Sequence, residues 1–221
     1  MKNKRYVLPF SAALVLFPAL LLAQELKPIE LPKPQTDAGM PLMQALKARH
    51  STREFKPDRL PAQVLSNLLW AAFGVNRPDS DKRTAPSAMN WQEVAIYVAT
   101  ADGLYVYDAK ANRLNPVLNE DIRAATGTQD FVKGAPVSLV YVADLAKTHD
   151  AGRDEQMLYT AVDTGAIVQN VYLFCSSEGL ATVVRGSVDR EALTKVMKLR
   201  PNQRIIVAQT VRCCIGPPGR Y

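Results

Sequence analysis

EQMLYTAVDTGAIVQNVYLFCSSEGL, residues 155–180, holds the longest helical pattern in the chain. Apolar and small side chains recur along it at spacings of three or four residues, and Gly179 ends the pattern. We therefore expect a long core helix over residues 155–178, with Cys175 buried in it. The small residues of this helix, Gly165 among them, either let a second helix approach closely, as in a dimer interface, or fill a crowded interior.

Shorter helices and strands lie on both sides of this segment, without the regular alternation of doubly wound folds. The chain contains neither a G-x-G-x-x-G motif nor a P-loop, which disfavours dinucleotide and nucleoside triphosphate sites. The sequence predicts an α+β fold. Its expected elements are helices at 41–49, 61–73, 120–125 and 189–199, strands at 94–100, 104–107, 137–143, 182–185 and 204–211, and a loop at 74–90.

The N-terminus has the pattern of a secretory signal. Three basic residues precede an apolar run over residues 6–22, and Ala23 supplies a small residue at the expected cut. Cleavage implies an exported protein, in the periplasm or outside the cell, whereas an uncleaved segment would anchor it in a membrane. The predicted organisation is a signal peptide at 1–23, a proline-rich linker or arm at 24–39 and one domain at 40–221.

Charge and cysteine content exclude several kinds of function. Lysine and arginine are spread along the chain without interleaved aromatic residues, so the net charge of +6 gives no support for a nucleic-acid partner. Three cysteines without C-x-x-C spacing and two histidines make a metal site improbable. The vicinal pair Cys213-Cys214 is either redox-active or without such a role, and the sequence leaves both interpretations open.

Arg49-His50-Ser51-Thr52-Arg53 has the composition of an anion clamp. Guanidinium groups give paired N–H donors that stay charged, and a hydroxyl can satisfy a further oxygen of a phosphate. The alternative is a solvated basic helix end, favoured by the helix dipole.

Two further segments suit a ligand. Pro86-Ser87-Ala88-Met89-Asn90-Trp91-Gln92 leads into an apolar strand, and its amides could face the edge of a heteroaromatic ring, although a polar loop that caps a strand looks the same. The other segment, Arg185-Gly186, ends a strand at a glycine that either exposes a backbone N–H to a ligand or makes a turn.

In this order the three segments resemble the nitroreductase-like family of FMN enzymes, over roughly residues 41–211. The segment from Arg49 to Phe55 is similar to the family's basic-basic-Ser-x-basic-x-Phe motif. The resemblance implies a central antiparallel or mixed sheet flanked by helices in an interlocked homodimer. It implies that Arg49, Ser51 and Arg53 bind the phosphate and ribityl chain of FMN, with His50 in a position that is often Arg.

The same resemblance implies roles for the other two segments. Asn90 would hydrogen-bond the isoalloxazine ring, and the backbone amides of Arg185-Gly186 would lie near flavin N5. The other residues of the ring loop expected to contact the cofactor are Pro86, Ser87, Ala88 and Gln92. The family's C-terminal Gly-Tyr-Pro is absent, so Arg212 or Arg220 would have to supply the last phosphate contact.

The implied activity is an oxidoreductase that passes a hydride or electrons through flavin N5, with NAD(P)H as one donor and a small molecule or a peptide as substrate. No side chain is expected to act as an acid or base. The proline-rich arm looks nearer to the branch that includes azoline (SagB-type) dehydrogenases. The alternatives are a flavin-binding carrier or sensor and an interaction protein that kept the fold without catalysis.

Overall fold

The computed structural model describes residues 25–53, 58–148 and 151–213, and its core is one antiparallel sheet. The seven strands lie in the order β1-β6-β5-β4-β7-β9-β8. β7 lies inside the sheet, between β4 and β9, and nearly all its side chains are buried, as its continuous apolar sequence predicts. The strands are β1 (Ile29–Glu30), β4 (Val94–Thr100), β5 (Gly103–Asp108), β6 (Arg113–Leu118), β7 (Val137–Asp144), β8 (Leu180–Arg185) and β9 (Gln203–Cys213).

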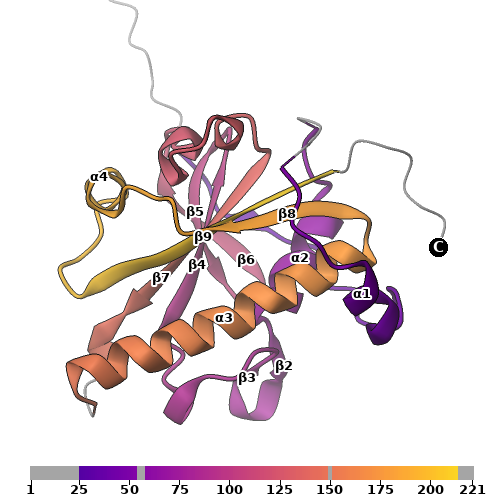
Figure 1. The fold of residues 1–221 in the computed structure, drawn as a ribbon, viewed down its shortest axis with the longest axis horizontal. Helices are drawn as coiled ribbons and strands as arrows, with labels where there is room; N and C mark the ends of the chain where they lie inside the picture. The colour runs from indigo at the N-terminus through magenta and orange to yellow at the C-terminus, as the bar shows by residue number, and fades with distance from the viewer. Residues whose placement is uncertain (1–24, 54–57, 149–150, 214–221) are drawn as a thin grey trace, which may run out of the picture.

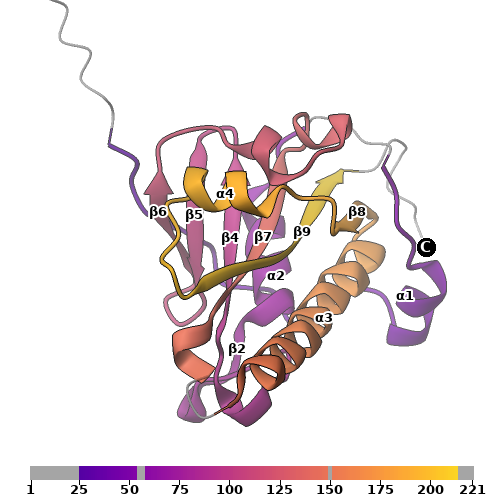
Figure 2. The ribbon, with the colours of Figure 1, turned by 60° about the vertical axis from the view of Figure 1, so that its left-hand side comes forward.

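Helices cover the two faces of this sheet. The long helix α3 (Arg153–Ser177) and the helix α2 (Ala62–Phe73) pack on one face, and the short helix α4 (Arg190–Val196) packs on the other. Figure 1 shows α3 running along the sheet, with α1 (Leu42–Ala48) beside its C-terminal half, and Figure 2 shows the same neighbours from another side. The predicted α+β fold is confirmed.

The long helix follows its expected bounds within two residues. Cys175 is fully buried, as predicted. Gly165, in contrast, is exposed, and no atom lies within 4 Å of the place where a Cβ would stand. Among the residues that the structure describes, therefore, none makes a close contact with Gly165.

The proline-rich segment is an arm that packs against the domain. Leu31 is buried, and the carbonyl of Pro32 accepts hydrogen bonds from Ser66 Oγ at 2.5 Å and Asn112 Nδ2 at 2.9 Å. The arm also contributes β1, which pairs with β6. Further along, the backbone N–H of Met40 donates to Ser177 Oγ at 2.6 Å, so the arm reaches the end of α3.

Three other details differ from the sequence predictions. β6 was not expected, because Pro116 within it is unusual in a strand. The predicted loop at 74–90 contains a small hairpin, β2 (Val75–Arg77) with β3 (Lys82–Arg83). The expected helix at 120–125 is a 3-10 turn at Arg123–Thr126.

Some predictions concern residues outside the described part. These are the signal peptide at 1–23, Glu54 and Phe55 of the family motif, Cys214 and Arg220. Among the residues that are described, no helix is long and apolar enough to cross a membrane, and no group of three His, Cys, Asp or Glu side chains is placed to hold a metal ion.

Candidate functional site

The predicted anion clamp lies where the chain leaves α1 and runs toward β8. α1 ends at Ala48, and Arg49 closes it with a backbone bond to Ala45 O at 2.9 Å. Arg49 has ψ 121°, so the chain turns out of the helix there. The backbone N–H of Thr52 then donates to Thr182 O at 3.1 Å. Residues 49–53 are thus fixed between the end of α1 and β8, the strand at one edge of the sheet.

Tyr172 of α3 organises the clamp. Its hydroxyl lies 2.7 Å from Ser51 Oγ and accepts a hydrogen bond from the backbone N–H of Val184 at 3.0 Å. The Arg49 guanidinium lies over the Tyr172 ring, 5.2 Å from its centroid. When the tyrosine donates its hydrogen to Ser51, the serine keeps its own hydrogen for a ligand oxygen. One side chain therefore orients both the hydroxyl and the guanidinium of the clamp.

The other two clamp residues are oriented differently. The His50 ring turns back to its own helix, with Nδ1 2.8 Å from Ala48 O, and it is exposed. Arg53 is exposed as well. The structure therefore brings Arg49 and Ser51 together, leaves Arg53 open to solvent beside them, and gives His50 a partner in the backbone.

The predicted ring loop has an unusual backbone. Met89, Asn90 and Gln92 have φ of 50°, 56° and 47°, in the left-handed region that residues other than glycine seldom adopt. Such conformations are strained and persist only where the surroundings enforce them. Strain of this kind clusters at ligand sites, which agrees with the predicted role of this loop.

The amide side chains of this loop differ in whether they are free to bind a ligand. The Gln92 amide is occupied within the protein, because Nε2 donates to Asp81 O at 3.0 Å and Oε1 accepts from Arg83 Nε at 2.8 Å. Gln92 Nε2 also donates to Asn90 Oδ1 at 3.1 Å, which fixes the Asn90 amide. Asn90 itself is exposed. Asn90 is thus the amide of this loop that can meet a ligand, and Gln92 supports it.

Asn90 borders a hollow of about 670 Å³. Pro86 and Ser87, two other predicted site residues, line the same hollow. The rest of its lining is mostly basic or polar: Ala85 is apolar, and the others are Arg77, Lys82, Arg83, Asn76 and Thr84. A ligand that gains negative charge would be favoured in this hollow.

The side chains of Arg185 and Arg212 lie apart from the clamp. Side chains alternate along a strand, and both of these point to the face opposite α3. Arg185 is 3% exposed and donates to Thr126 O at 2.7 Å, and Arg212 donates to Phe131 O. Burial lowers the pKa of each to about 10, and both stay charged near neutral pH. Their guanidiniums hold the segment around residues 123–132 onto the sheet.

Gly186 remains a candidate through its backbone. It is exposed, and nothing lies within 4 Å of the place where a side chain would begin. A ligand could therefore approach its main chain closely. The predicted contact of the Arg185-Gly186 amides with a flavin is compatible with this geometry, although the Arg185 side chain serves the opposite face.

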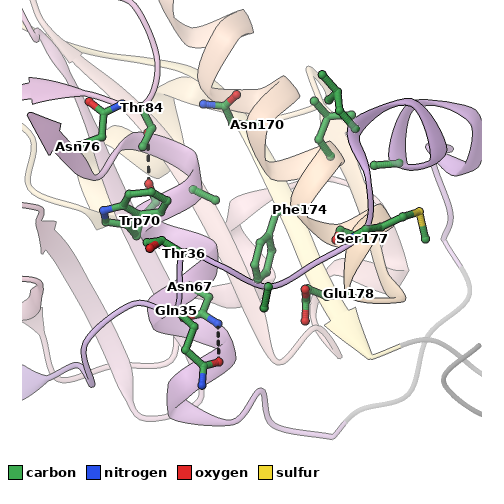
Figure 3. Close-up of a pocket in the computed structure, with 16 residues that line it drawn as sticks. Gln35, Thr36, Asn67, Trp70, Asn76, Thr84, Asn170, Phe174, Ser177 and Glu178 are labelled. Carbon is green, nitrogen blue, oxygen red and sulfur yellow. Dashed lines mark hydrogen bonds between the residues drawn. The ribbon is translucent and has the colours of Figure 1, made fainter. Parts of the chain in front are cut away.

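A separate cavity of about 440 Å³ lies between the arm, α1, α2 and α3 (Figure 3). Trp70 and Phe174 give it apolar walls, and the amides of Gln35, Asn67 and Asn170 surround them. Neither Ser51 nor Tyr172 lines it. Asn170, which the sequence placed in the family's central helix, faces this cavity and donates to Ala72 O at 3.3 Å.

The sequence analysis missed three residues that hold the site together. The helical spacing predicts that Tyr172 is a core residue, but it does not show that its hydroxyl reaches Ser51. Glu93 and Asp163 are buried carboxyl groups beneath the ring loop. The signal that could have found them is an acidic residue at a position where the surrounding pattern is apolar, directly before a core strand and inside a core helix.

Comparisons with known proteins agree on one family. The profile described as "Nitroreductase family" matches residues 46–211. A protein of Methanocaldococcus jannaschii named "putative nitroreductase MJ1384" is 30% identical over 162 residues, which are 69% of this chain and 81% of that protein. A crystal structure from Ralstonia eutropha JMP134, named in the same way, has a TM-score of 0.83 and 39% identity, and the match covers 95% of this chain and all of that one.

A more distant likeness concerns the fold alone. The Escherichia coli microcin synthetase McbBCD complex contains a chain with a TM-score of 0.66 and 18% identity, which covers 97% of this chain and 79% of that chain. Placement in the azoline dehydrogenase branch therefore stays a prediction. The profile match spans most of the chain and includes the clamp, the ring loop and all of the sheet except β1 and the end of β9. The chain belongs to the nitroreductase family, whose members are flavin-dependent oxidoreductases.

Proposed function

We propose that this protein is an exported FMN-dependent oxidoreductase that works as a homodimer. The observation that carries the proposal is the clamp, in which Tyr172 presents the Ser51 hydroxyl and the Arg49 guanidinium together. Permanent cations and a hydroxyl with a free hydrogen are the donor set that a phosphate monoester needs. Exposed Arg53 adds a further cation at the same place.

The spacing of the two parts of the site suits FMN. The clamp contacts α3 at Tyr172, and the ring loop contacts it at Asp163. Nine residues of helix separate these contacts, about 14 Å along the axis. A cofactor with a phosphate at one end and a flat ring at the other would span this distance, with Asn90 at the ring edge.

When bound, the flavin supplies hydride transfer at N5. The chain's own residues bind and orient the cofactor. Arg49, Ser51 and Arg53 hold the phosphate, Asn90 fixes the ring edge, and the main chain of Gly186 comes close to it. The basic hollow beside Asn90 favours negative charge that develops on the ring. No side chain of the described site is assigned as a general acid or base.

The dimer is proposed from an apolar stripe on α3. Leu158 and Val162 are 61% and 59% exposed, and Gly165, on the same side of the helix one turn later, leaves open space beside it. Met43 of α1 is 75% exposed. Apolar side chains gathered on helices in this way favour association with a second helix face. Family members are typically homodimers, which agrees with this assignment.

Val162→Arg tests the dimer. The variant places a charge in the proposed dimer interface and should sediment as a monomer. Lys27→Arg, on the arm, should leave the dimer intact. A dimeric Val162→Arg protein with unchanged dissociation constant would remove the α3 stripe from the interface.

The substrate and the electron donor follow less directly. We propose NAD(P)H as one candidate electron donor. Because nicotinamide donors are scarce outside the cytoplasm, a different reductant would supply electrons to the exported protein. A small molecule or a peptide is the proposed substrate. Because the N-terminal signal lacks twin arginines, the chain would be exported unfolded and would take up FMN afterwards.

The experiment that tests the proposal is the visible spectrum of residues 24–221 after incubation with FMN and gel filtration. We expect flavin absorption to co-elute with a dimer, at about one flavin per chain. Bound flavin that is then reduced by a supplied donor and reoxidised by an acceptor completes the case for an enzyme. A colourless protein overturns the proposal, and bound flavin without any turnover leaves a carrier or sensor.

A further inference from the structure

Two buried carboxyl groups lie beneath the ring loop and fasten it to α3. Glu93 is 1% exposed and Asp163 is 4% exposed. Asp163 Oδ2 accepts a hydrogen bond from the backbone N–H of Ala88 at 2.8 Å, and Ser87 Oγ donates to Glu93 Oε2 at 3.3 Å. Ser87 Oγ also accepts from the backbone N–H of Gln92 at 2.8 Å, so both ends of the loop depend on this pair.

The surroundings allow only one of the two groups to be charged at low cost. Burial raises the pKa of both Glu93 and Asp163, and the charge of Asp163 raises that of Glu93 further. Hydrogen bonds work in the opposite direction on both groups, from Ala88 N–H, Ser87 and Glu93 on Asp163 and from the backbone, Ser87 and Thr160 on Glu93. Asp163 accepts the short backbone bond from Ala88, at 2.8 Å, which suits a carboxylate, so the proton is assigned to Glu93.

The hydrogen-bond pattern agrees with this assignment. With both groups ionised, Glu93 Oε1 is a buried oxygen with no hydrogen-bond partner among the residues that the structure describes. A buried acceptor left without a partner is costly. A proton on Glu93 turns one of its oxygens into a donor toward Asp163, whose carboxylate a hydrogen bond from Glu93 stabilises.

We propose that Glu93 and Asp163 share one proton, and that this proton holds residues 87–92 in the conformation that presents Asn90. Glu93 and Asp163 are thus positioning residues, which act through Ser87 and the Ala88 amide. The contact between Asn90 and a flavin rests on the proposed function. The effect of the proton on the loop conformation does not rest on it, because that effect depends only on contacts within the chain.

The strained backbone makes the loop responsive to this proton. Met89, Asn90 and Gln92 each have a positive φ, and such residues relax when their restraints weaken. Loss of the shared proton would leave two like charges buried side by side, and the cheapest relief is for the loop to move and admit water. We therefore expect local release rather than unfolding of the sheet.

Other charged groups near the pair do not neutralise it. Lys147 Nζ and Arg83 Nε both bond to Gln92, at its carbonyl and its side chain respectively. From β7, Asp144 donates its backbone N–H to Glu93 O, while its carboxylate pairs with Arg200. On α3, the Thr160 hydroxyl also stabilises the Glu93 carboxylate weakly. Of these groups, Asp163 is the charge that acts on the Glu93 carboxyl.

Trp91 provides a reporter within the loop itself. Its ring meets the Tyr159 ring edge-on, with centroids 5.9 Å apart, so its fluorescence should change when the loop leaves α3. The chain has two tryptophans, and Trp70→Phe leaves Trp91 as the single emitter. In flavin-free Trp70→Phe protein we expect one sigmoidal change in emission as the pH rises through the raised pKa of Glu93, with the circular dichroism of the fold unchanged.

Glu93→Gln is the decisive variant, because glutamine has the shape of protonated glutamate and cannot lose the proton. In the Trp70→Phe background it should abolish the change in emission, and Asp163→Asn should move the change to lower pH, because it removes the charge that raises the pKa of Glu93. Glu120→Gln, which removes an exposed carboxylate, should leave it in place. A transition of unchanged midpoint in Glu93→Gln, or no transition in the parent protein, overturns the proposal.

Titration with FMN separates this proposal from the proposed function. Above the transition the affinity should fall by up to about tenfold per pH unit, the limit for one linked proton, and it should be independent of pH in Glu93→Gln. Absence of FMN binding at every pH, with the Trp91 transition intact, refutes the proposed function alone. Binding that is equally pH-dependent in Glu93→Gln refutes the role of the carboxyl pair alone.

Discussion

The clamp and the ring loop are both held by α3, but by different means. The clamp has no residue with a positive φ, its Arg53 is exposed while Arg49 is half-buried, and Tyr172 orients both Ser51 and Arg49. The ring loop carries three left-handed residues and rests on two buried acids. Binding a phosphate needs only permanent charge at the surface, whereas aligning a ring edge needs a fixed backbone. The guanidiniums of the clamp should therefore keep their charge over the pH range in which the carboxyl pair beneath the loop titrates.

The largest expected effect is on cofactor binding by the clamp. Arg53→Glu replaces an attractive charge with a repulsive one and should raise the dissociation constant for FMN by about tenfold or more. Fluorescence titration with FMN measures this, and Lys27→Glu, an equal charge reversal on the arm, serves as the control. An unchanged dissociation constant in Arg53→Glu would show that the phosphate lies elsewhere.

Tyr172→Phe tests whether the clamp depends on a single hydroxyl. The change leaves the Val184 N–H without its acceptor and should lower the free energy of unfolding by about 1–3 kcal/mol. Urea denaturation measures this. Tyr97→Phe, which loses only a contact of 3.5 Å from Gln203, should cost much less. Equal losses in the two variants would mean that the Tyr172 hydroxyl has no special role.

The pH dependence of stability tests the buried carboxyl pair beneath the ring loop. The pKa of Glu93 is raised in the folded state above its ordinary value of 4.5. Its contribution to stability is therefore complete below that value and is lost as the pH rises through the folded pKa, by about 1.4 kcal/mol for each unit of difference. Urea denaturation at a series of pH values should show this slope in the wild type and a flatter profile in Glu93→Gln. Parallel profiles would contradict the assignment of the proton.

The smallest expected effect comes from relieving the strain of the loop. Met89→Gly should raise the free energy of unfolding by about 0.5–1 kcal/mol, because glycine adopts a positive φ without steric cost. Met43→Gly, the same change within α1, should lower it by a similar amount, because glycine is a poor helix former. A loss of stability in Met89→Gly would argue that the loop is not strained there.

The sequence predicted the parts of the site that depend on residue type and order. Arg49, Ser51 and Arg53 follow a motif within a few residues, and the structure places Ser51 and Arg49 together against Tyr172. That they bind a phosphate stays a prediction. The long helix was placed closely because its apolar spacing persists over many turns. β6 was missed because proline within a strand lowers the local signal, although pairing with β5 overrides it.

Long-range partners and backbone strain were beyond prediction from the sequence. Tyr172 and Ser51 are 121 positions apart, so no local pattern connects them. The left-handed φ of Met89 cannot be inferred from its residue type, which normally avoids that region. Glu93 sits between a polar residue and an apolar strand, a position that equally suits a solvated side chain. Tertiary packing decides each of these features.

The way in which the sheet ends has a consequence for how the protein associates. On one side the terminal strand is β1, which has only two residues, and on the other β8 carries the clamp segment through the bond from Thr52 to Thr182. Short or covered borders offer few free backbone groups to another chain's strand. Self-association through intermolecular β-pairing, the usual beginning of aggregates, is thereby discouraged, and helix surfaces are left as the natural route to an ordered complex.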